Sequence, residues 1–460
     1  MAFFLYNQKD NHGEHERLTT KVVYMRSVNP QDVKKIFLDY MQNHNHLKIS
    51  GASIIPKDDP SLLFINAGMA PMKAYFSGQK TPPQSDLCNV QPCIRTIDID
   101  DVGDMHHLTM FEMLGSWSIN NYFKQKSIEL AYDLLVNHYQ FSKDRLYATV
   151  YGGNESLGIP ADTESAGFWK QVGLPETHIV ILKNDNFWSA GDTGPCGPCT
   201  EVFFDTENQN IPSYHETGDF DTKHRYMEIW NAGVFMQYNR KADGSLETLP
   251  FKSVDTGAGF ERLTMALNGK KSVYDTEIFS PYMTMLNTEI NGNSAETTRA
   301  KRIIADHIRA ATLIVSEGVF PGKEGQNYIP RKLIRRAMTE SAIHTESKLK
   351  FEDIANIAIV QLNLDYPVVG INSKRTLDVL NGEMNNFQKT LNQGMKYFNK
   401  ISRNTQTVTG KQIFDLQTSF GLPFDFIAQL AKKSDKILEV DIYKKLLAEH
   451  KMISKNGLVK

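Results

Sequence analysis

Cysteine is scarce in this sequence, which has four in 460 residues: Cys88, Cys93, Cys196 and Cys199. So few cysteines argue against a disulfide framework. Cys196 and Cys199 form a C-x-x-C pair, which in other settings is half of a zinc site or a redox motif. No second pair lies at zinc-finger spacing, and the surrounding Gly-Pro-rich sequence predicts a loop. We therefore expect no zinc and no redox role at this pair.

The sequence also lacks long apolar runs and a large net charge. No stretch approaches the roughly 18 apolar residues of a membrane helix, and the apolar residues 1–6 lack the basic flank of a signal peptide. The composition, 41% hydrophobic and 23% charged, is that of soluble globular proteins. We therefore expect a cytoplasmic protein with no membrane partner. Because the net charge is -2, any nucleic-acid contact must come from a local basic patch.

The pattern of apolar residues divides the chain into three parts. Residues 1–28 are polar and mixed, which predicts a solvated extension. At Asn29-Pro30 an N-cap residue followed by proline predicts the start of a helix. From there we expect one domain over residues 29–270 and a second over 271–460.

Two kinds of periodicity distinguish these domains. Between residues 52 and 262, short runs of β-branched and aromatic residues predict strands, and the last three have little helix between them. This pattern predicts an α+β fold around an antiparallel sheet. After residue 272 apolar residues recur at helical spacing, which predicts an all-helical domain. The predicted strands are 61–66, 146–151, 178–183, 201–205 and 226–238, and the predicted helices are 128–138, 299–317, 331–344 and 384–403.

Two arginines and one aromatic residue indicate phosphate and base binding. Arg95 can grip a phosphate with two hydrogen bonds and stabilise charge that develops there, and Phe111 can stack on adenine. Arg262 follows Gly257 and Gly259, which let the backbone approach a ligand closely. Ordinary strand and turn chemistry explains each feature alone equally well, and the glycines do not form the G-x-G-x-x-G dinucleotide fingerprint. A third feature, the Gly-Pro-rich stretch 185–201, is either a rigid binding-site wall or a surface turn.

Taken in order, five segments resemble the alanyl-tRNA synthetase family, which belongs to class II of the aminoacyl-tRNA synthetases. The resemblance runs from about residue 31 to 440. No single segment is decisive, but five in the same order make coincidence negligible. The segments are Pro60–Met69, which is similar to motif 1; Gln91–Arg95 with Phe111–Gly115, similar to motif 2; Gly191–Glu201, similar to the D-T-G-P-C-G-P-C-T-E stretch; Ser253–Arg262, similar to motif 3; and Ala305–Arg309, similar to the start of the tRNA-recognition helices.

The resemblance implies a class II antiparallel sheet flanked by helices, followed by a helical domain that docks the tRNA acceptor stem. It implies that ATP is bound by Arg95 at the α-phosphate and by Arg262 at the γ-phosphate. Phe111 would stack on adenine, with Glu112 also in the ATP site. Magnesium between the phosphates is implied, with Glu201 as its ligand.

The resemblance also implies an amino-acid pocket lined by Trp188, Val234 and Asp255. Asp255 would pair with the substrate ammonium, and this role makes physical sense because a buried carboxylate is costly unless it is paired. A helix or turn cap is the alternative role of Asp255.

The chain departs from the family in the motif 2 loop and in one pocket strand. The loop, residues 96–103, is short and acidic, and negative charge beside a phosphate is unfavourable unless magnesium intervenes. The segment Trp230–Phe235 is one residue longer than the family's W-N-x-V-F, and a glycine insertion there would re-aim Val234. The resemblance covers no editing domain, so we expect no proofreading and measurable activation of glycine or serine beside alanine.

The residues that would read RNA also differ. Where the family carries an asparagine and an aspartate that read the G-U pair of the acceptor stem, this sequence offers Lys323 and Thr418. The basic residues Arg331, Arg335 and Arg336 remain and would grip phosphates, which positions an RNA without specifying its sequence. A solvated helix face is the alternative for this cluster.

Three hypotheses follow. The first is an alanine-type tRNA ligase that uses ATP and magnesium to activate a small amino acid and passes it to the 3' end of tRNA. The second is a paralogous adenylating enzyme with an unusual tRNA or a non-RNA acceptor, which Lys323 and Thr418 favour. The third is a synthetase-like RNA-binding regulatory module, which the presence of Arg95, Phe111 and Arg262 disfavours.

Overall fold

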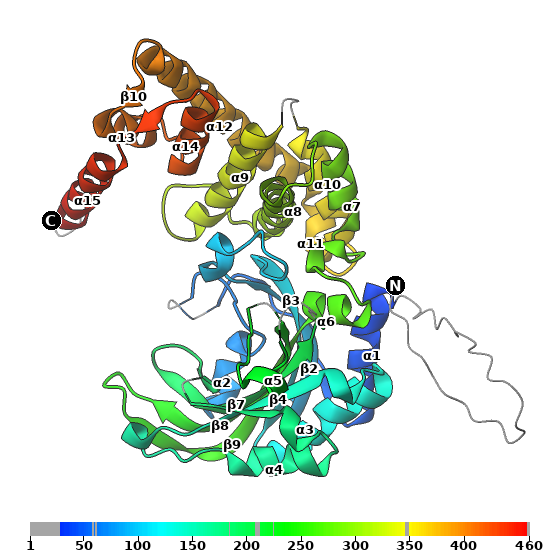
Figure 1. Cartoon of the computed structure of the whole chain (residues 1–460). Coiled ribbons are helices and arrows are strands. Elements are labelled where there is room, and N and C mark those ends of the chain that lie inside the picture. The colour runs from blue at the N-terminus through cyan, green and yellow to red at the C-terminus, as the bar shows by residue number, and fades with distance from the viewer. Residues whose placement is uncertain are drawn as a thin grey trace, which may run out of the picture.

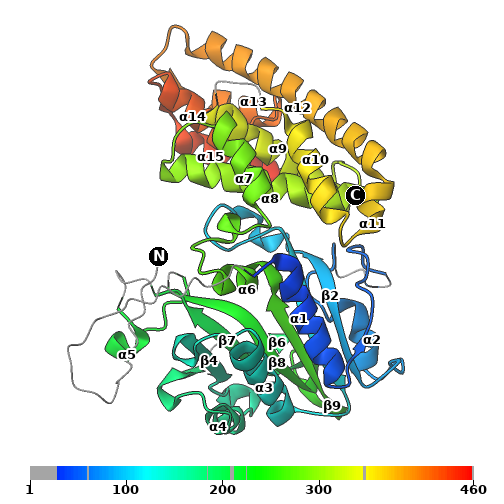
Figure 2. The same ribbon diagram turned by 90° about the vertical axis from the view of Figure 1, so that its right-hand side faces the viewer.

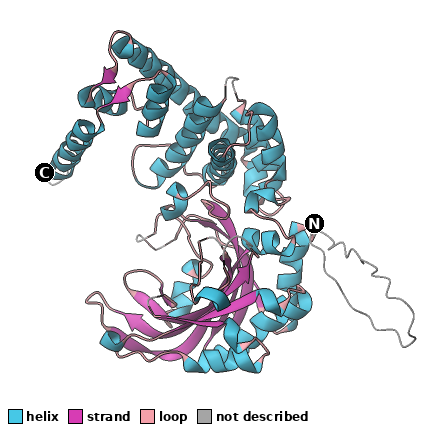
Figure 3. Ribbon diagram, in the orientation of Figure 1, coloured by secondary structure: helices cyan, strands magenta, loops and turns pink. Residues whose placement is uncertain are grey.

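The computed structural model describes residues 28–57, 59, 62–183, 185–207, 212–223, 225–345 and 349–457. Its two halves differ in architecture (Figure 1): strands fill the half built from the first part of the chain, and helices fill the other half. Figure 3 shows this division by colour: the long strands lie in the lower half, with helices around them, and the upper half is almost all helix. The predicted extension, residues 1–28, lies almost entirely outside the described residues.

One mixed sheet organises the first half. Within the described residues nine strands join in the order β1-β2-β3-β9-β8-β7-β4-β5, with β6 paired to β7. The pairs β1·β2 and β4·β5 are parallel and the others antiparallel. The strands are β1 Leu47–Lys48, β2 Asp86–Ile94, β3 Met110–Ile119, β4 Leu146–Tyr151, β5 Ile179–Leu182, β6 Phe187–Ser189, β7 Gly194–Asp205, β8 Tyr226–Arg240 and β9 Leu246–Gly259.

Helices cover one face of this sheet and build the second half. Figure 2 shows α1, α3 and α4 against the sheet, with the remaining long helices stacked above it. No helix among the described residues is long and apolar enough to span a membrane. The helices are α1 Pro30–Asn43, α2 Lys73–Phe76, α3 Lys124–Asp133, α4 Thr163–Gln171, α5 Tyr214–Thr217, α6 Phe260–Leu267, α7 Ser280–Glu289, α8 Ala295–Ser316, α9 Gly325–His344, α10 Phe351–Leu362, α11 Pro367–Ile371, α12 Ser373–Ser402, α13 Gly410–Thr418, α14 Phe424–Lys433 and α15 Val440–Gly457.

The predicted helix start at Asn29-Pro30 and most predicted strands are confirmed. The Asn29 side chain accepts a hydrogen bond from the Gln31 backbone and caps α1, whose buried face includes Val33, Phe37 and Tyr40. The strand predicted at 146–151 coincides with β4, and those at 178–183, 201–205 and 226–238 fall on β5, β7 and β8. The predicted helices at 299–317, 331–344 and 384–403 fall within or overlap α8, α9 and α12.

Three predictions of local structure are wrong. Residues 62–66 form no strand, although Phe64 and Ile65 are buried; their apolar run serves packing. The Gly-Pro-rich stretch predicted as a loop is strand β7, where Cys196 and Cys199 are buried and free. The second half is helical but not entirely so, because Thr407–Val408 and Ile437–Leu438 pair as the short strands β10 and β11.

The extra residue in the Trp230–Phe235 segment forms a β-bulge, as the sequence indicated. Between Asn231 and Val234 strand β8 advances three residues while β9 advances two, from Gly257 to Asp255. The Ser127 hydroxyl of α3 donates a 2.7 Å hydrogen bond to the Ala232 carbonyl inside the bulge. As a result Val234 lies directly opposite Asp255.

Candidate active site

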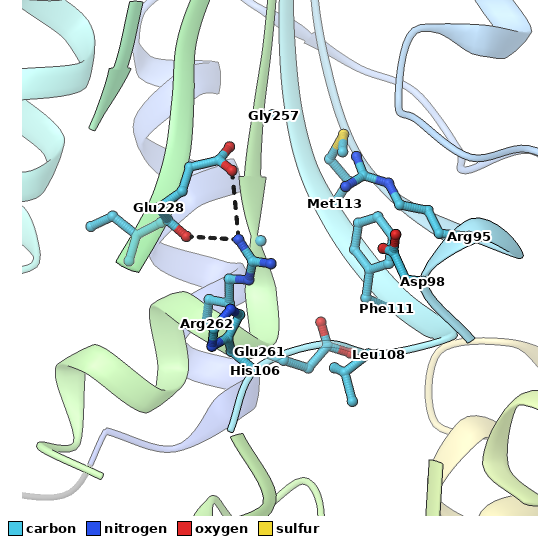
Figure 4. A pocket seen from close by; sticks show the side chains of 12 residues that line it. Arg95, Asp98, His106, Leu108, Phe111, Met113, Glu228, Gly257, Glu261 and Arg262 are labelled. Atoms are coloured by element: carbon cyan, nitrogen blue, oxygen red, sulfur yellow. Dashed lines mark hydrogen bonds and ion pairs between the residues drawn. The ribbon is translucent and has the colours of Figure 1, made fainter. Parts of the chain in front are cut away.

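A pocket opens on the sheet face opposite α1 and α3. It brings together the two predicted arginines and the predicted stacking ring, which come from β2–β3 and from the start of α6. Figure 4 shows Arg262 on one side of the pocket and Arg95 beside Phe111 on the other. The lining residues are Arg95, Asp98, His106, Leu108, Phe111, Met113, Glu228, Ile229, Gly257, Gly259, Glu261 and Arg262.

Arg95 and Phe111 form one wall of the pocket. The guanidinium carbon of Arg95 lies 4.8 Å from the centroid of the Phe111 ring, which is a cation–π geometry. Arg95 Nε also donates to the carbonyl of Asn66 at 3.2 Å. The ring and the cation thus offer a stacking surface and a phosphate-binding group at the same place.

Arg262 projects from the first turn of α6 on the other wall. Its Nη1 donates to the Glu228 carbonyl at 3.2 Å and lies 3.5 Å from the Glu228 carboxylate. His106 faces the same space, and burial together with the Arg262 charge lowers the pKa of His106 to about 4. The imidazole is therefore neutral at pH 7, and Arg262 supplies the positive charge on this side.

Glycines of β3 and β9 lie between the two walls of the pocket. Met113 pairs with Gly259 and Gly115 with Gly257 across β3 and β9. A Cβ on Gly257 would lie 2.5 Å from the Met113 sulfur, and one on Gly115 would lie 2.2 Å from the Trp117 ring. We call Gly115, Gly257 and Gly259 the glycine floor. The Trp117 ring and Met113 fill the space that a side chain on Gly115 or Gly257 would need, so both positions require glycine. Gly257 and Gly259 line the pocket.

The predicted amino-acid pocket lies at the end of this floor. Cys199, Val234, Asp255 and Trp117 are direct cross-strand partners in one row across β7, β8, β9 and β3. Trp188 of β6 packs against the same apolar cluster. Asp255 is buried, and Trp117 Nε1 donates a 2.7 Å hydrogen bond to it. Burial raises the pKa of Asp255 to about 7, against the lowering effect of that bond.

Glu201, the predicted magnesium ligand, lies in the adjoining row. It pairs with Asn231, which pairs with Gly257 of the glycine floor, and the Asn231 amide donates to Glu201 at 3.2 Å. Burial and the charge of Glu228 raise the pKa of Glu201 to about 8, and Asp185 adds to the effect. Crowded carboxylates with a raised pKa are a donor set that a hard divalent cation would relieve.

The structure does not bring Glu112 to the pocket. On β3 successive side chains point to opposite faces, so Phe111 and Met113 face the pocket while Glu112 faces α1. There the Lys34 ammonium binds the Glu112 carboxylate at 2.7 and 2.8 Å, and the Tyr366 hydroxyl also donates to it. Glu112 is therefore a buried ion-pair partner and not an ATP ligand in this geometry.

The basic residues predicted to grip RNA already have partners. Arg331 and Arg335 share the Glu383 carboxylate, at 3.5 and 2.6 Å. Arg336 donates to the Ile99 carbonyl in the motif 2 loop. This arrangement differs from the free phosphate-binding patch that the sequence predicted, because Arg331 and Arg335 both pair with the single Glu383 carboxylate, which offsets one of their two charges.

Lys323 and Thr418 are both exposed. Lys323 lies in the loop before α9. Thr418 lies at the end of α13, and its hydroxyl donates to the Phe414 carbonyl of its own helix at 2.7 Å. Neither residue contacts the pocket described above.

One other group of side chains has the composition of a metal site. Asp104, His106 and His107 place ligand atoms within 4.8 Å of one another. The Asp104 carboxylate, however, already binds the His107 ring at 2.5 Å and both histidine backbone amides. Because the Arg262 charge also acts on both imidazoles, the surroundings disfavour a cation there.

Sequence reasoning missed three features of the pocket. Glu228 and His106 lie beside Arg262, and Met113 lines the pocket beside the glycine floor. The period-two spacing of Phe111, Met113 and Gly115 would have placed Met113. No local pattern would have placed Glu228, because it lies on β8, far from Arg262 in the sequence.

Comparisons with known proteins identify the relatives of this chain. The family model "tRNA synthetases class II (A)" matches residues 32–459. The chain is 37% identical over 438 residues to an alanine--tRNA ligase of Borrelia hermsii, covering 93% of this chain and 73% of that one.

A second relative, an alanine--tRNA ligase of Candida albicans, is 36% identical over 456 residues, covering 92% of this chain and 46% of that protein. This chain thus spans about half the length of several curated relatives that it matches. Among solved structures, apo histidyl-tRNA synthetase of S. aureus gives a TM-score of 0.35 at 14% identity, over 56% of this chain and 74% of that one. By the family model and by its likeness to the alanine--tRNA ligase of Borrelia hermsii, the chain belongs to the class II tRNA synthetases, in the family of the alanine--tRNA ligases.

Proposed function

We propose that this protein activates alanine with ATP and transfers it to the 3' end of a tRNA. One observation carries the proposal: Arg95 and Arg262 lie on opposite walls of one pocket whose glycine floor leads to the buried Asp255. A nucleotide needs the first part of this arrangement and a small amino acid needs the second. The names of the relatives in Borrelia hermsii and Candida albicans support the choice of alanine.

The chemistry assigned to each residue follows from its place. Phe111 stacks on adenine, Arg95 binds the α-phosphate and Arg262 binds the γ-phosphate. Asp255 holds the substrate ammonium, with Val234 and Trp188 limiting the side chain. The substrate carboxylate then attacks the α-phosphorus in line, the bond to the β-phosphate oxygen breaks, and pyrophosphate leaves. Arg95 stabilises the charge that develops on the α-phosphoryl oxygens.

The carboxylates of Glu201 and Glu228, which lie close together beside the pocket, suit a magnesium ion. Glu201 is the residue proposed to hold it, with Glu228 close by. When bound, the ion would neutralise phosphate charge. The acidic loop residue Asp98, which also lines the pocket, makes such neutralisation more useful, because it adds negative charge beside the phosphates.

The test is amino-acid-dependent exchange of pyrophosphate into ATP, run over all twenty amino acids. We expect exchange with alanine, and weaker exchange with glycine or serine. No exchange with any amino acid in the presence of magnesium would refute the proposed activation.

The sequence also supports two further proposals: a cytoplasmic location, and two domains that divide near residue 270.

A second function deserves the same test because of Lys323 and Thr418. Both are exposed, and neither offers the amide or carboxylate that the family uses to read the acceptor stem. A paralogous enzyme that passes the activated amino acid to an unusual tRNA or a non-RNA acceptor would show robust exchange with alanine but no charging of alanine tRNA.

A further inference from the structure

A buried arginine of the helical half contacts both walls of the pocket region at once. It binds the strand segment around Phe111 and the start of α6. Arg309 of α8 donates to the Met110 carbonyl at 2.8 Å and to the Glu261 carboxylate at 3.0 Å. The other Glu261 oxygen accepts from the backbone N–H of Glu112 at 3.0 Å. The side chains of Arg309 and Glu261 are 3% and 1% exposed.

The partners of Arg309 are neighbours of the pocket residues in sequence. Met110 and Glu112 flank Phe111, and Glu261 directly precedes Arg262. Backbone hydrogen bonds on both sides of Phe111 fix the orientation of the strand from which its ring projects. The ion pair with Glu261 holds the first turn of α6, from which Arg262 projects. Arg309 therefore sets the distance between the two walls without touching the pocket.

A second residue of the same helix supports this arrangement. Asp306 lies one turn before Arg309 and accepts a hydrogen bond from the Thr109 backbone N–H at 2.8 Å. Asp306 is itself bound by the His307 ring at 2.7 Å. Helix α8 thus holds Thr109 and Met110, the two positions before the stacking ring, directly, and holds Glu112, the position after it, through Glu261.

We propose that Arg309 is a positioning residue for ATP: it holds Phe111 and Arg262 at the separation that ATP needs. The inference rests on the proposed function in that the ligand is ATP. It assigns to the helical half a role in nucleotide binding that is separate from any contact with RNA.

The deciding variant is Arg309→Lys. Lysine keeps a positive charge but has one nitrogen, which cannot replace the guanidinium fork that serves Met110 and Glu261 together. Glu261→Gln removes the charge and keeps the shape. Lys301→Met is the matched control: Lys301 is a buried cation of the same helix, 2% exposed, but its ammonium binds Asn287 and the Gly292 carbonyl, both at 2.9 Å, away from the pocket.

The measurements are pyrophosphate exchange with varied ATP or alanine, and the thermal midpoint of unfolding. We expect Arg309→Lys and Glu261→Gln to raise the KM for ATP about tenfold or more, since small misplacements of binding groups have effects of this order. The KM for alanine should change less than about threefold, because the residues proposed to bind alanine do not contact Arg309 or Glu261. The double variant should lose little more than either single one, because both break one unit. Lys301→Met should lower the midpoint while leaving the KM for ATP near wild type.

Two results would overturn the proposal. One is an unchanged KM for ATP in Arg309→Lys. The other is a parallel loss in Arg309→Lys and Lys301→Met that follows the thermal midpoint, which would make Arg309 a structural residue only. If the wild type shows no exchange with any amino acid, the proposed function fails. Calorimetric titration with MgATP then decides the present inference, and equal Kd values for wild type and a folded Arg309→Lys or Glu261→Gln would overturn it.

Discussion

The indole of Trp117 donates a 2.7 Å hydrogen bond to the carboxylate of Asp255, its direct cross-strand partner. This single bond orients a buried carboxylate at the end of the glycine floor. Burial outweighs the bond and raises the pKa of Asp255 to about 7. The free protein thus holds a carboxyl group that a bound ammonium would convert fully to the charged form.

The first prediction concerns the pH dependence of amino-acid binding. Below pH 7 a growing fraction of Asp255 is protonated and cannot pair with an ammonium. We expect the KM for alanine in pyrophosphate exchange to rise by up to about tenfold for each pH unit below 7. Asp255→Asn should remove this dependence and weaken binding about 100-fold or more, as loss of a buried ionic partner does. A steep profile that persists in Asp255→Asn would assign it to another group.

The same pKa gives a second prediction, for folding stability. Because the folded pKa is raised above the unfolded value near 4, Asp255 favours folding below about pH 4, and this contribution is lost as the pH rises to 7. In Asp255→Asn that part of the pH dependence should vanish. Urea unfolding of both proteins at several pH values between 4 and 8 measures it, and identical profiles would contradict the prediction.

A third prediction concerns Arg262. It faces the pocket from the first turn of α6 and would stabilise phosphate charge more in the transition state than in the ground state. Arg262→Ala should therefore lower exchange by about 100-fold or more, a typical loss for a charge-stabilising donor. Lys241→Ala, in an exposed hairpin, serves as the control that should keep wild-type rates. A normal rate in Arg262→Ala would defeat the assignment of the site.

A fourth prediction follows from the pairing of Arg331 and Arg335 with Glu383. This carboxylate pairs with both of the cations that the sequence assigned to phosphates and offsets one of their two charges. Glu383→Gln should free them, tighten RNA binding and steepen its dependence on salt by about one unit of log–log slope per added phosphate contact. Filter binding of an alanine tRNA at several salt concentrations tests this. Unchanged affinity and slope would mean that these arginines lie away from the RNA.

The last prediction concerns the acceptor stem. Lys323 can only donate hydrogen bonds, and the Thr418 hydroxyl is engaged by its own helix. Changing the G-U pair of an alanine tRNA to G-C should therefore alter charging by less than about tenfold, or roughly 1.4 kcal/mol. The two transcripts are to be compared in identical salt. A loss of several hundredfold with G-C would show that other residues read the pair.

Local patterns in the sequence predicted much of this structure but not the side-chain directions at the site. The cap at Asn29 and the strand at 146–151 depend on neighbouring residues, and both are confirmed. The extra residue in 230–235 was visible by resemblance and forms the predicted bulge. The resemblance places Glu112 in the ATP site, yet side chains alternate along the strand and Glu112 points to Lys34 instead. Arg335 of α9 pairs with Glu383 of α12, and a contact between two helices this far apart in the sequence cannot be predicted from a local pattern.

The alternation on β3 also limits how this protein can change in length. Phe111 and Met113 face the pocket while Met110, Glu112 and Leu114 face the buried core and its ion pair. Inserting or deleting one residue in this strand would exchange the two faces, placing a carboxylate where the base stacks and an aromatic ring against Lys34. Side chains in the loop before the strand do not alternate between two faces, so a change in its length would not exchange them. Length variation among viable descendants of this gene should therefore accumulate between residues 96 and 108 and spare 110–117.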